Sequence, residues 1–301
     1  MKTTAKILTL ALITLMLTSC ADKKTNNIIT SASSKTETKK EMTNVTYSNI
    51  TDQDTIKLTE NILKNAGVDE NSRKSFINEV DKFNKSVDRK YLTDGFEMEQ
   101  SIYTKYDPYE MQEEYQENNP DFQGYNCRIT AMYLYKNYLK TNDNLDLDTS
   151  DIVFDLESLK ENKSALNNKE LNKFISLYAS VPTEKTKDIN IHAAKLKEEW
   201  NKRGIQFSPS DKIKMINVVQ NDSFSNDDSH LFIGHAGILL PQNNNELYFL
   251  EKVAFQEPYR LNKFNNRKEL HNYLMEKYDT SYNQPTAKPF IMENDEIMNV
   301  E

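Results

Sequence analysis

Hydrophobic side chains recur every three or four residues in several parts of the chain, the spacing of one face of a helix. Phe76, Val80, Phe83 and Val87 follow this spacing after Asp69, a residue type that caps helix starts. The same pattern, with residues that commonly begin or end helices at its limits, predicts further packing helices. They lie at about 54–66, 127–140, 168–179, 191–203 and 267–278.

Strand-forming residues are concentrated between the last two of these helices. Segments 212–219, 231–240 and 247–256 are rich in Val, Ile, Phe and Tyr, and residues 241–245 are expected to form the turn between the last two. The stretch 95–123 is acidic, rich in Tyr and interrupted by proline, so we expect it to be irregular with short helical pieces. The predicted fold class is therefore α+β.

A short apolar run begins the chain. Lys2 and Lys6 precede residues 7–17, which are too few to cross a membrane comfortably, and the tetrapeptide Leu-Thr-Ser-Cys follows. This order resembles the bacterial lipobox. The resemblance implies cleavage after residue 19 and a lipid on the sulfur of Cys20, so that acyl chains hold the mature protein at the outer face of the cell membrane without spanning it. The alternative is a secreted protein in which Cys20 occurs by chance.

The remaining sequence divides into a tether and one domain. Residues 20–45 are mostly Lys, Thr, Ser and Asn, a composition typical of a flexible tether. Residues 46–301 contain no second linker and are expected to form a single domain, with additional helices at about 50–95 and a core at about 120–280. Two of the 38 basic residues fall in residues 1–19, so the mature chain has 36 basic and 46 acidic residues, a formal net charge of −10. This acidity argues against a nucleic-acid partner and against strong electrostatic binding to anionic lipid or wall polymer.

Cys127 is the one cysteine left once Cys20 carries lipid, and an unpaired thiol in an exported protein calls for an explanation. It begins the predicted helix 127–140, on the same stripe as Ala131 and Leu134. The unpaired N–H groups and the dipole at a helix start lower the pKa of a thiol and can bind an oxyanion. A cysteine on an apolar helix face is also a common core residue, so Cys127 taken alone favours a packing role.

A histidine and a glutamate interrupt otherwise apolar strands. His235 lies in the predicted strand 231–240, and Glu251 is the carboxylate on the apolar face of the predicted strand 247–256. If residues 241–245 form the loop, counting outward from it pairs His235 with Glu251. Directly opposed residues share a face with their Cβ atoms about 5 Å apart, which a hydrogen bond between the two side chains can span.

A thiol, an imidazole and a carboxylate in this chain order resemble the papain-like fold, particularly the NlpC-type cell-wall amidases and peptidases. The resemblance implies that Cys127 is the nucleophile, His235 the general base and Glu251 the residue that orients the base. The side-chain amides of Gln123 and Asn126 are candidate oxyanion donors. Two features depart from the usual pattern: the papain-like oxyanion glutamine lies further from its cysteine, and the third residue is more often Asn, Asp or His.

Most of the mature chain also resembles a family of Gram-positive surface lipoproteins of unknown function. The likeness rests on Asn-Cys-Arg at 126–128, His-Ala-Gly at 235–237 and Phe-Gln-Glu-Pro-Tyr at 255–259. It supplies no activity, but it implies that residues of the last motif and the arginine directly after it line the same cleft as the thiol. The residues that it adds are Gln256, Glu257 and Arg260.

The other histidines are weaker candidates for the base. His192 and His271 lie in polar helices and are expected to be solvated or half-buried. His230 and His235 are five residues apart, and such a pair points to opposite faces of a regular strand, so the two are not expected to share a metal ion. Because the sequence also contains no metal-binding cysteine–histidine motif and no phosphate loop, neither a metal nor a cofactor is expected.

Three functions are compatible with these features. The first is an extracytoplasmic thiol hydrolase that cleaves an amide or peptide bond, in a peptide or cell-wall substrate, through an acyl-thioester on Cys127. The second is a lipoprotein that binds a ligand or protein partner and keeps Cys127 in its core. The third is an acyl transferase in which an amine resolves the thioester in place of water. The order of Cys127, His235 and Glu251 and their expected shared face favour the hydrolase.

Overall fold

The computed structural model describes residues 43–300, except 101–103, 105, 143–144, 163–164, 226–227, 244–245 and 282. The predicted signal peptide, Cys20 and the predicted tether up to residue 42 lie outside these residues. Within the described part, no helix is long and apolar enough to cross a membrane.

Each helix that the sequence predicts is present, and side chains cap most of the helix starts. Asp52, Asp69 and Asn266 each accept a hydrogen bond from the first turn of the helix that follows. Helix α5 was not predicted, and α3 is the helical piece of the stretch expected to be irregular. The α-helices of the described residues are α1 (Gln53–Asn65), α2 (Glu70–Lys85), α3 (Pro108–Asn118), α4 (Cys127–Tyr135), α5 (Val153–Glu161), α6 (Asn168–Tyr178), α7 (Ile189–Lys202) and α8 (Arg267–Tyr278). Short 3₁₀ turns occur at Arg89–Tyr91, Lys136–Tyr138 and Ser150–Ile152.

The strands form one large antiparallel sheet in the order β11-β10-β6-β7-β8-β9-β1-β2, with β4 added to β7, and β3 pairs with β5 apart from it. The three predicted strands are present as β6, β7 and β8, although β8 ends at Lys252, four residues before its predicted end. The strands are β1 (Asn44–Ser48), β2 (Glu97–Gln100), β3 (Leu139–Lys140), β4 (Val181–Pro182), β5 (Gln206–Phe207), β6 (Lys214–Ser225), β7 (Asp228–Pro241), β8 (Leu247–Lys252), β9 (Tyr259–Phe264), β10 (Phe290–Glu293) and β11 (Glu296–Ile297). The α+β class is thus confirmed.

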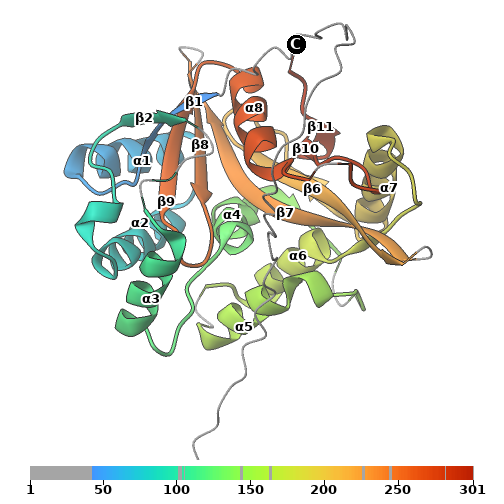
Figure 1. Cartoon of the computed structure of the whole chain (residues 1–301), viewed down its shortest axis with the longest axis horizontal. Coiled ribbons are helices and arrows are strands. Elements are labelled where there is room, and N and C mark those ends of the chain that lie inside the picture. The colour runs from blue at the N-terminus through green and yellow to red at the C-terminus, as the bar shows by residue number, and fades with distance from the viewer. Residues whose placement is uncertain are drawn as a thin grey trace, which may run out of the picture. The chain divides into compact units, whose positions relative to one another are not determined.

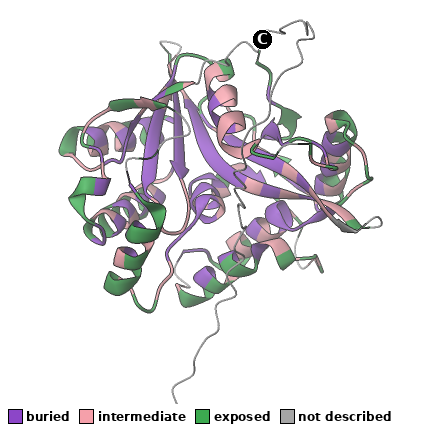
Figure 2. Ribbon diagram, in the orientation of Figure 1, coloured by how far each residue is buried: buried purple, intermediate pink, exposed green. Residues whose placement is uncertain are grey.

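Helices cover both faces of this sheet (Figure 1). On one face, α1, α2, α4, α6 and α7 form a large apolar core with alternate strand residues such as Ile238 and Leu250. On the other face, α8 packs Leu270 and Leu274 against the intervening residues, such as Leu239. The central strands are therefore mostly buried, apart from the ends of β6 and β7 that join each other, and exposed surface is found mainly on the outer helices (Figure 2).

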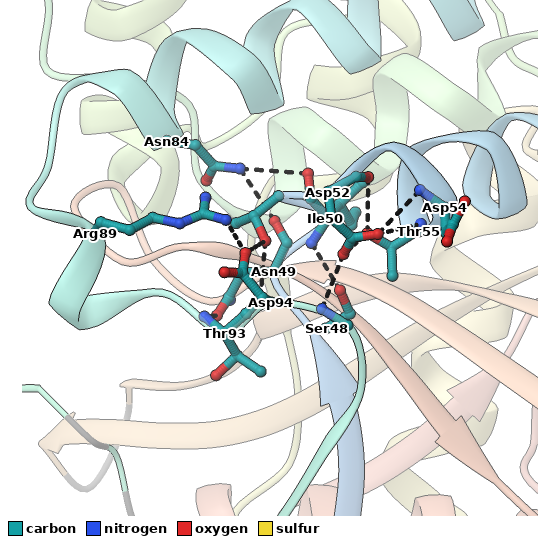
Figure 3. A network of polar contacts seen from close by, with 12 residues as sticks. Ser48, Asn49, Ile50, Asp52, Asp54, Thr55, Asn84, Arg89, Thr93 and Asp94 are labelled. Carbon is teal, nitrogen blue, oxygen red and sulfur yellow. Dashed lines mark hydrogen bonds and ion pairs between the residues drawn. The ribbon is translucent and has the colours of Figure 1, made fainter.

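The N-terminal helices are joined to the sheet by a polar network between β1 and α1 (Figure 3). Asn49 donates from its side-chain amide to the Tyr259 carbonyl at 2.9 Å and accepts from the Thr93 N–H at 2.9 Å. Asn84 of α2 donates to the Asn49 carbonyl at 3.1 Å. Next to it, Ile50 has a φ of +57°, an unusual conformation for a β-branched residue. These contacts hold the chain in this turn and fix α1 and α2 beside β9.

The pairing of β7 with β8 differs by two residues from the predicted register. Leu240 pairs with Tyr248 and the last pair is Ile238 with Leu250, so this register runs toward Gly237 opposite Glu251 and does not place His235 there. The loop keeps the expected five residues but is shifted by one, to 242–246, and the Gln242 N–H donates to the Glu246 carbonyl across it. A shift of two keeps every side chain on its predicted face, because the side-chain period of a strand is two. His235 and Glu251 are consequently diagonal neighbours.

Gly237→Ala is expected to lower the free energy of unfolding by about 1–3 kcal/mol through overpacking. An added Cβ would lie 2.3 Å from the ring of Phe249 and 3.0 Å from the Leu250 carbonyl oxygen, and the backbone atom cannot move aside cheaply. Urea denaturation gives the measurement. Gly234→Ala on the same strand is the matched control, because its nearest atoms, at 2.8 Å, belong to the flexible Gln220 side chain. Equal losses in the two variants would contradict this account.

Candidate functional site

Cys127 is the first residue of α4. Asn126 caps the helix by accepting from the Ile129 N–H at 3.0 Å, so the backbone N–H groups of Cys127 and Arg128 have no intrahelical acceptor. The thiol is 6 % exposed and receives a hydrogen bond from the Ala236 N–H of β7. The sequence therefore predicted the position of this residue at a helix start correctly.

His235 and Glu251 are in direct contact. Nε2 of His235 lies 2.6 Å from Oε2 of Glu251, and both side chains are buried. The other carboxylate oxygen of Glu251 accepts from the Asn262 amide at 2.8 Å and, through a short hydrogen bond, from the Tyr273 hydroxyl. Both oxygens of this carboxylate are thus held by neighbours, which fixes the ring of His235 as well. Since Nε2 contacts the glutamate, Nδ1 is left for the hydrogen bond that His235 makes with Cys127.

The three residues meet where β7 and β8 separate. Cys127 comes from the helix on one face of the sheet, whereas His235 and Glu251 belong to the face that α8 covers. Pairing between β7 and β8 extends only as far as Ile238, so the Ala236 N–H beyond it is free to bind the sulfur. A bulge at Gly234 shifts β7 by one residue against β6 at the same point.

The site favours a charged thiol and a charged imidazole. Burial alone would raise the pKa of Cys127, but the charge and hydrogen bond of His235, the charge of Arg128 and the Ala236 N–H lower it below its ordinary value. Burial alone would lower the pKa of His235, but the thiolate and the hydrogen bonds of Cys127 and Glu251 raise it to about 9. Each charge supports the other, so the site stabilises the thiolate of Cys127 and the imidazolium of His235 together.

Arg128 ties the helix of the thiol to its surroundings. Its Nε and Nη2 atoms contact the two carboxylate oxygens of Asp155 at 2.8 and 2.5 Å, and Nη1 donates to the Ile233 carbonyl at 2.8 Å. Asp155 is fully buried and also accepts from the Asn126 amide at 2.8 Å. The pair therefore connects α4, α5 and β7 directly beside Cys127.

The predicted oxyanion donors have other partners. Gln123 donates from its amide to the Phe154 carbonyl at 2.8 Å. Asn126 uses its amide oxygen for the Ile129 N–H and its nitrogen for Asp155. The two free N–H groups at the start of α4 remain the better oxyanion donors next to the sulfur.

The three residues that the family resemblance adds, Gln256, Glu257 and Arg260, occupy different environments. Gln256 is half-buried in the turn between β8 and β9. Glu257 accepts from the Tyr106 hydroxyl at 2.7 Å. Arg260 is fully buried, is in register with Glu251 and donates to Glu99 at 2.7 Å. Arg260 thus lies next to the candidate triad in the sheet, and Glu257 lies at the end of the same hairpin.

Two expectations about the remaining histidines are wrong. His192 is completely buried and not solvated. Its two ring nitrogens are satisfied there by the Thr183 hydroxyl and the Thr186 carbonyl, each at 2.9 Å. The bulge at Gly234 places one extra residue between His230 and His235, so the two side chains lie on the same face of the sheet. His230 is in register with Asp222 and His235 with Val218, two residues on one face of β6. His230 instead contacts Asp151 at 3.3 Å. The described residues contain no group of three His, Cys, Asp or Glu side chains that could hold a metal ion.

Several residues around the thiol were not predicted, because their sequence context gives no sign of a site. Asp155 lies in a helix without a clear apolar stripe, and Asn262 lies in a strand with many polar residues. Tyr273 lies at an apolar position of the predicted helix 267–278, and such a position predicts a packing role and no part in a site. Tyr278, the last residue of α8, stacks on His235 with ring centroids 4.7 Å apart and planes at 20°.

Comparison with known proteins gives a family and nothing beyond it. No curated protein and no solved structure matches the chain. Residues 46–298 match the family described as a domain of unknown function, DUF4300, and this range includes Cys127, His235 and Glu251. Because the match covers most of the chain, the protein belongs to the DUF4300 family.

Proposed function

We propose that the protein is a thiol hydrolase of amide or peptide bonds. The observation that carries the proposal is that one buried imidazole, His235, contacts the thiol of Cys127 and the carboxylate of Glu251 at the same time. This is the arrangement of nucleophile, base and orienting group that thiol hydrolases use. The papain-like resemblance, with Glu251 as the third residue, belongs to this proposal.

The reaction follows from the positions of these groups. The sulfur of Cys127 attacks the substrate carbonyl, and the N–H groups at the start of α4 stabilise the oxyanion. The imidazolium of His235 gives its proton to the leaving amine as the carbon–nitrogen bond breaks. Water, deprotonated by His235, then attacks the thioester and releases a carboxylic acid. Glu251 keeps the ring oriented and stabilises its positive charge in both steps.

The cellular setting is part of the same proposal. A lipid on Cys20 would hold the domain at the extracytoplasmic face of the cell membrane, where peptides and cell-wall components are the available amide substrates. The low exposure of Cys127, at 6 %, favours the alternative of a ligand-binding lipoprotein with a core cysteine. The reactivity of the thiol decides between these two functions.

Alkylation of Cys127 by iodoacetamide is expected to proceed in the folded protein with a pH midpoint below 9. Mass spectrometry of the peptide that contains Cys127 separates this signal from Cys20. In His235→Ala the pKa of the thiol rises, because burial then acts without the opposing imidazolium. Once this pKa is above 7, each unit by which it rises lowers the thiolate fraction at pH 7 about tenfold, so the alkylation rate at pH 7 should fall about tenfold or more.

His230→Ala is the matched control, because His230 lies on the same strand and contacts Asp151 and not the thiol. It should leave the alkylation rate unchanged. A Cys127 that reacts only in denaturant, or equally fast with and without His235, would rule out the hydrolase and leave the binding function.

A further inference from the structure

A small pocket of about 220 Å³ lies between α2 and α4, two helices that pack against each other (Figure 1). Its walls include Ser75, Asn78, Glu79 and Lys82 of α2 and Ile129 and Tyr133 of α4, and we call it the α2–α4 pocket. Sites for drug-sized ligands have volumes of roughly 300–1,000 Å³. The α2–α4 pocket is smaller and therefore suits a ligand of about one ring.

The wall on α2 is polar. Its four residues are spaced i, i+3, i+4 and i+7, so a single stripe of the helix faces the pocket. Within the described part of the chain, the side chains of Ser75 and Asn78 make no hydrogen bond. Lys82 contacts one carboxylate oxygen of Glu79 at 2.6 Å, and the second oxygen has no donor among these residues. The wall thus offers donors and acceptors, and its two opposite charges compensate each other.

The facing wall and the buried end of the pocket are aromatic. Tyr125 and Tyr133 belong to this wall, and Phe76 and Tyr259 lie at the buried end, where their rings pack edge to face with centroids 5.5 Å apart. Tyr125 is 8 % exposed, and its hydroxyl makes no hydrogen bond with a residue that the structure describes. Burial and then the charge of Glu79 raise the pKa of both Tyr125 and Tyr259, so the carboxylate lies close to these hydroxyls.

A ligand of this pocket must match both walls. The electron-rich face of an aromatic ring attracts C–H groups, whereas hydroxyl groups satisfy the donors and acceptors of α2. A purely apolar ring would leave those polar groups without partners, which is costly. A charged ring would find no uncompensated opposite charge, because Glu79 and Lys82 already form a pair. A pyranose sugar has C–H groups on its face and hydroxyls around its edge, and it carries no charge.

We infer that the α2–α4 pocket binds a neutral sugar ring. The face of the ring packs on Tyr125 and Tyr133, and its hydroxyls bond to the amide of Asn78 and to the second carboxylate oxygen of Glu79. The described residues of the wall do not include a member of the candidate triad. Sugar binding is thus a separate property of the domain and does not require a reactive thiol.

Titration of the full-length protein with N-acetylglucosamine and, separately, with glucose tests this inference. With at least one of them, the backbone amide resonances of Asn78 and Ile129 should shift and saturate, with a Kd on the order of millimolar for so small a ligand. The resonance of Leu270, on the other face of the sheet, should not move. Glucosamine and glucuronate, which carry a positive and a negative charge at pH 7, should each bind more weakly. No saturable shift with either neutral sugar, or tighter binding of a charged one, would overturn the inference.

Three variants show whether the two walls act as described. Tyr133→Ala should weaken binding about fivefold to tenfold, because it removes part of the aromatic wall. Glu79→Gln should weaken binding of the neutral sugar and improve that of glucuronate, since Lys82 then has no partner. Tyr109→Ala is the control, because Tyr109 is 79 % exposed on α3 outside the pocket. It should leave the affinity unchanged.

Circular dichroism establishes that each variant is folded. Unchanged affinity in Glu79→Gln or in a folded Tyr133→Ala would overturn the inference. So would N-acetylglycinamide, a neutral peptide-like probe, if it bound as tightly as the sugar and with the same dependence on Tyr133, because the pocket would then be a peptide site. Alkylation of Cys127 reports on the hydrolase alone, so failure of that proposal remains distinguishable from these outcomes.

Discussion

Arg128→Met is expected to lower the free energy of unfolding by about 3–5 kcal/mol, the cost of leaving one member of a buried ion pair without its partner. Arg128 is only 12 % exposed in its side chain and Asp155 is completely buried, so water cannot replace the lost contacts. The variant also removes the donor to the Ile233 carbonyl. Urea denaturation at pH 7 measures the loss.

Two further variants show whether burial is the cause. Replacing both partners, with Arg128→Met and Asp155→Leu together, should cost less than the single change, because no charge is then left buried. Arg89→Met removes a pair with Asp94 in which both side chains are more than half exposed, and it should cost less than about 1 kcal/mol. A double variant as unstable as Arg128→Met alone would show that the pair does not act through its buried charge.

Glu251→Gln is expected to destabilise the protein by on the order of 3 kcal/mol at neutral pH, with a loss that shrinks in acid. Burial alone would raise the pKa of Glu251, but the hydrogen bond of His235, the charges of Lys277 and His235 and the Tyr273 hydroxyl lower it to about 2. The carboxylate therefore stabilises the folded state above its ordinary pKa of 4.5, and this stabilisation is lost as the pH falls toward 2.

Urea denaturation of both proteins at pH 7 and at pH 3 measures this difference. The gap between wild type and Glu251→Gln should be smaller at pH 3. Glu246→Gln, which removes a half-exposed partner of Lys263, is the control and should show little change at either pH. A gap that stays constant between the two pH values would mean that the Glu251 carboxylate is not held in its charged form by the fold.

Local sequence signals were sufficient for the helices and for the faces of the central hairpin. The apolar stripe of its helix located Cys127 at the helix start, and the two-residue period of a strand placed His235 and Glu251 on one face. The register could not be predicted in the same way, because it depends on how the loop after Pro241 closes. The bulge at Gly234 is equally invisible, since a glycine in a strand also marks ordinary close packing.

The strands next to the site were missed because they are polar. β9 contains Arg260 and Asn262, which are buried only because Glu99 and Glu251 are brought to them from other parts of the chain. β1 is five residues long and has a similar mixture of polar and apolar residues. Periodicity reports local amphipathicity, and neither strand has enough of it to be distinguished from a loop.

The position of β1 in the sheet also sets an order of events during folding. Thr46 pairs with Lys263 and Tyr47 with Asn262, more than 200 residues later, so this part of the sheet cannot form until almost the whole domain has been synthesised. Contacts of such long sequence separation are slow, because a large loop must close first. Asn262 is also the residue that holds the Glu251 carboxylate. We therefore expect the hydrogen bond between Asn262 and Glu251 to form only in the last stage of folding.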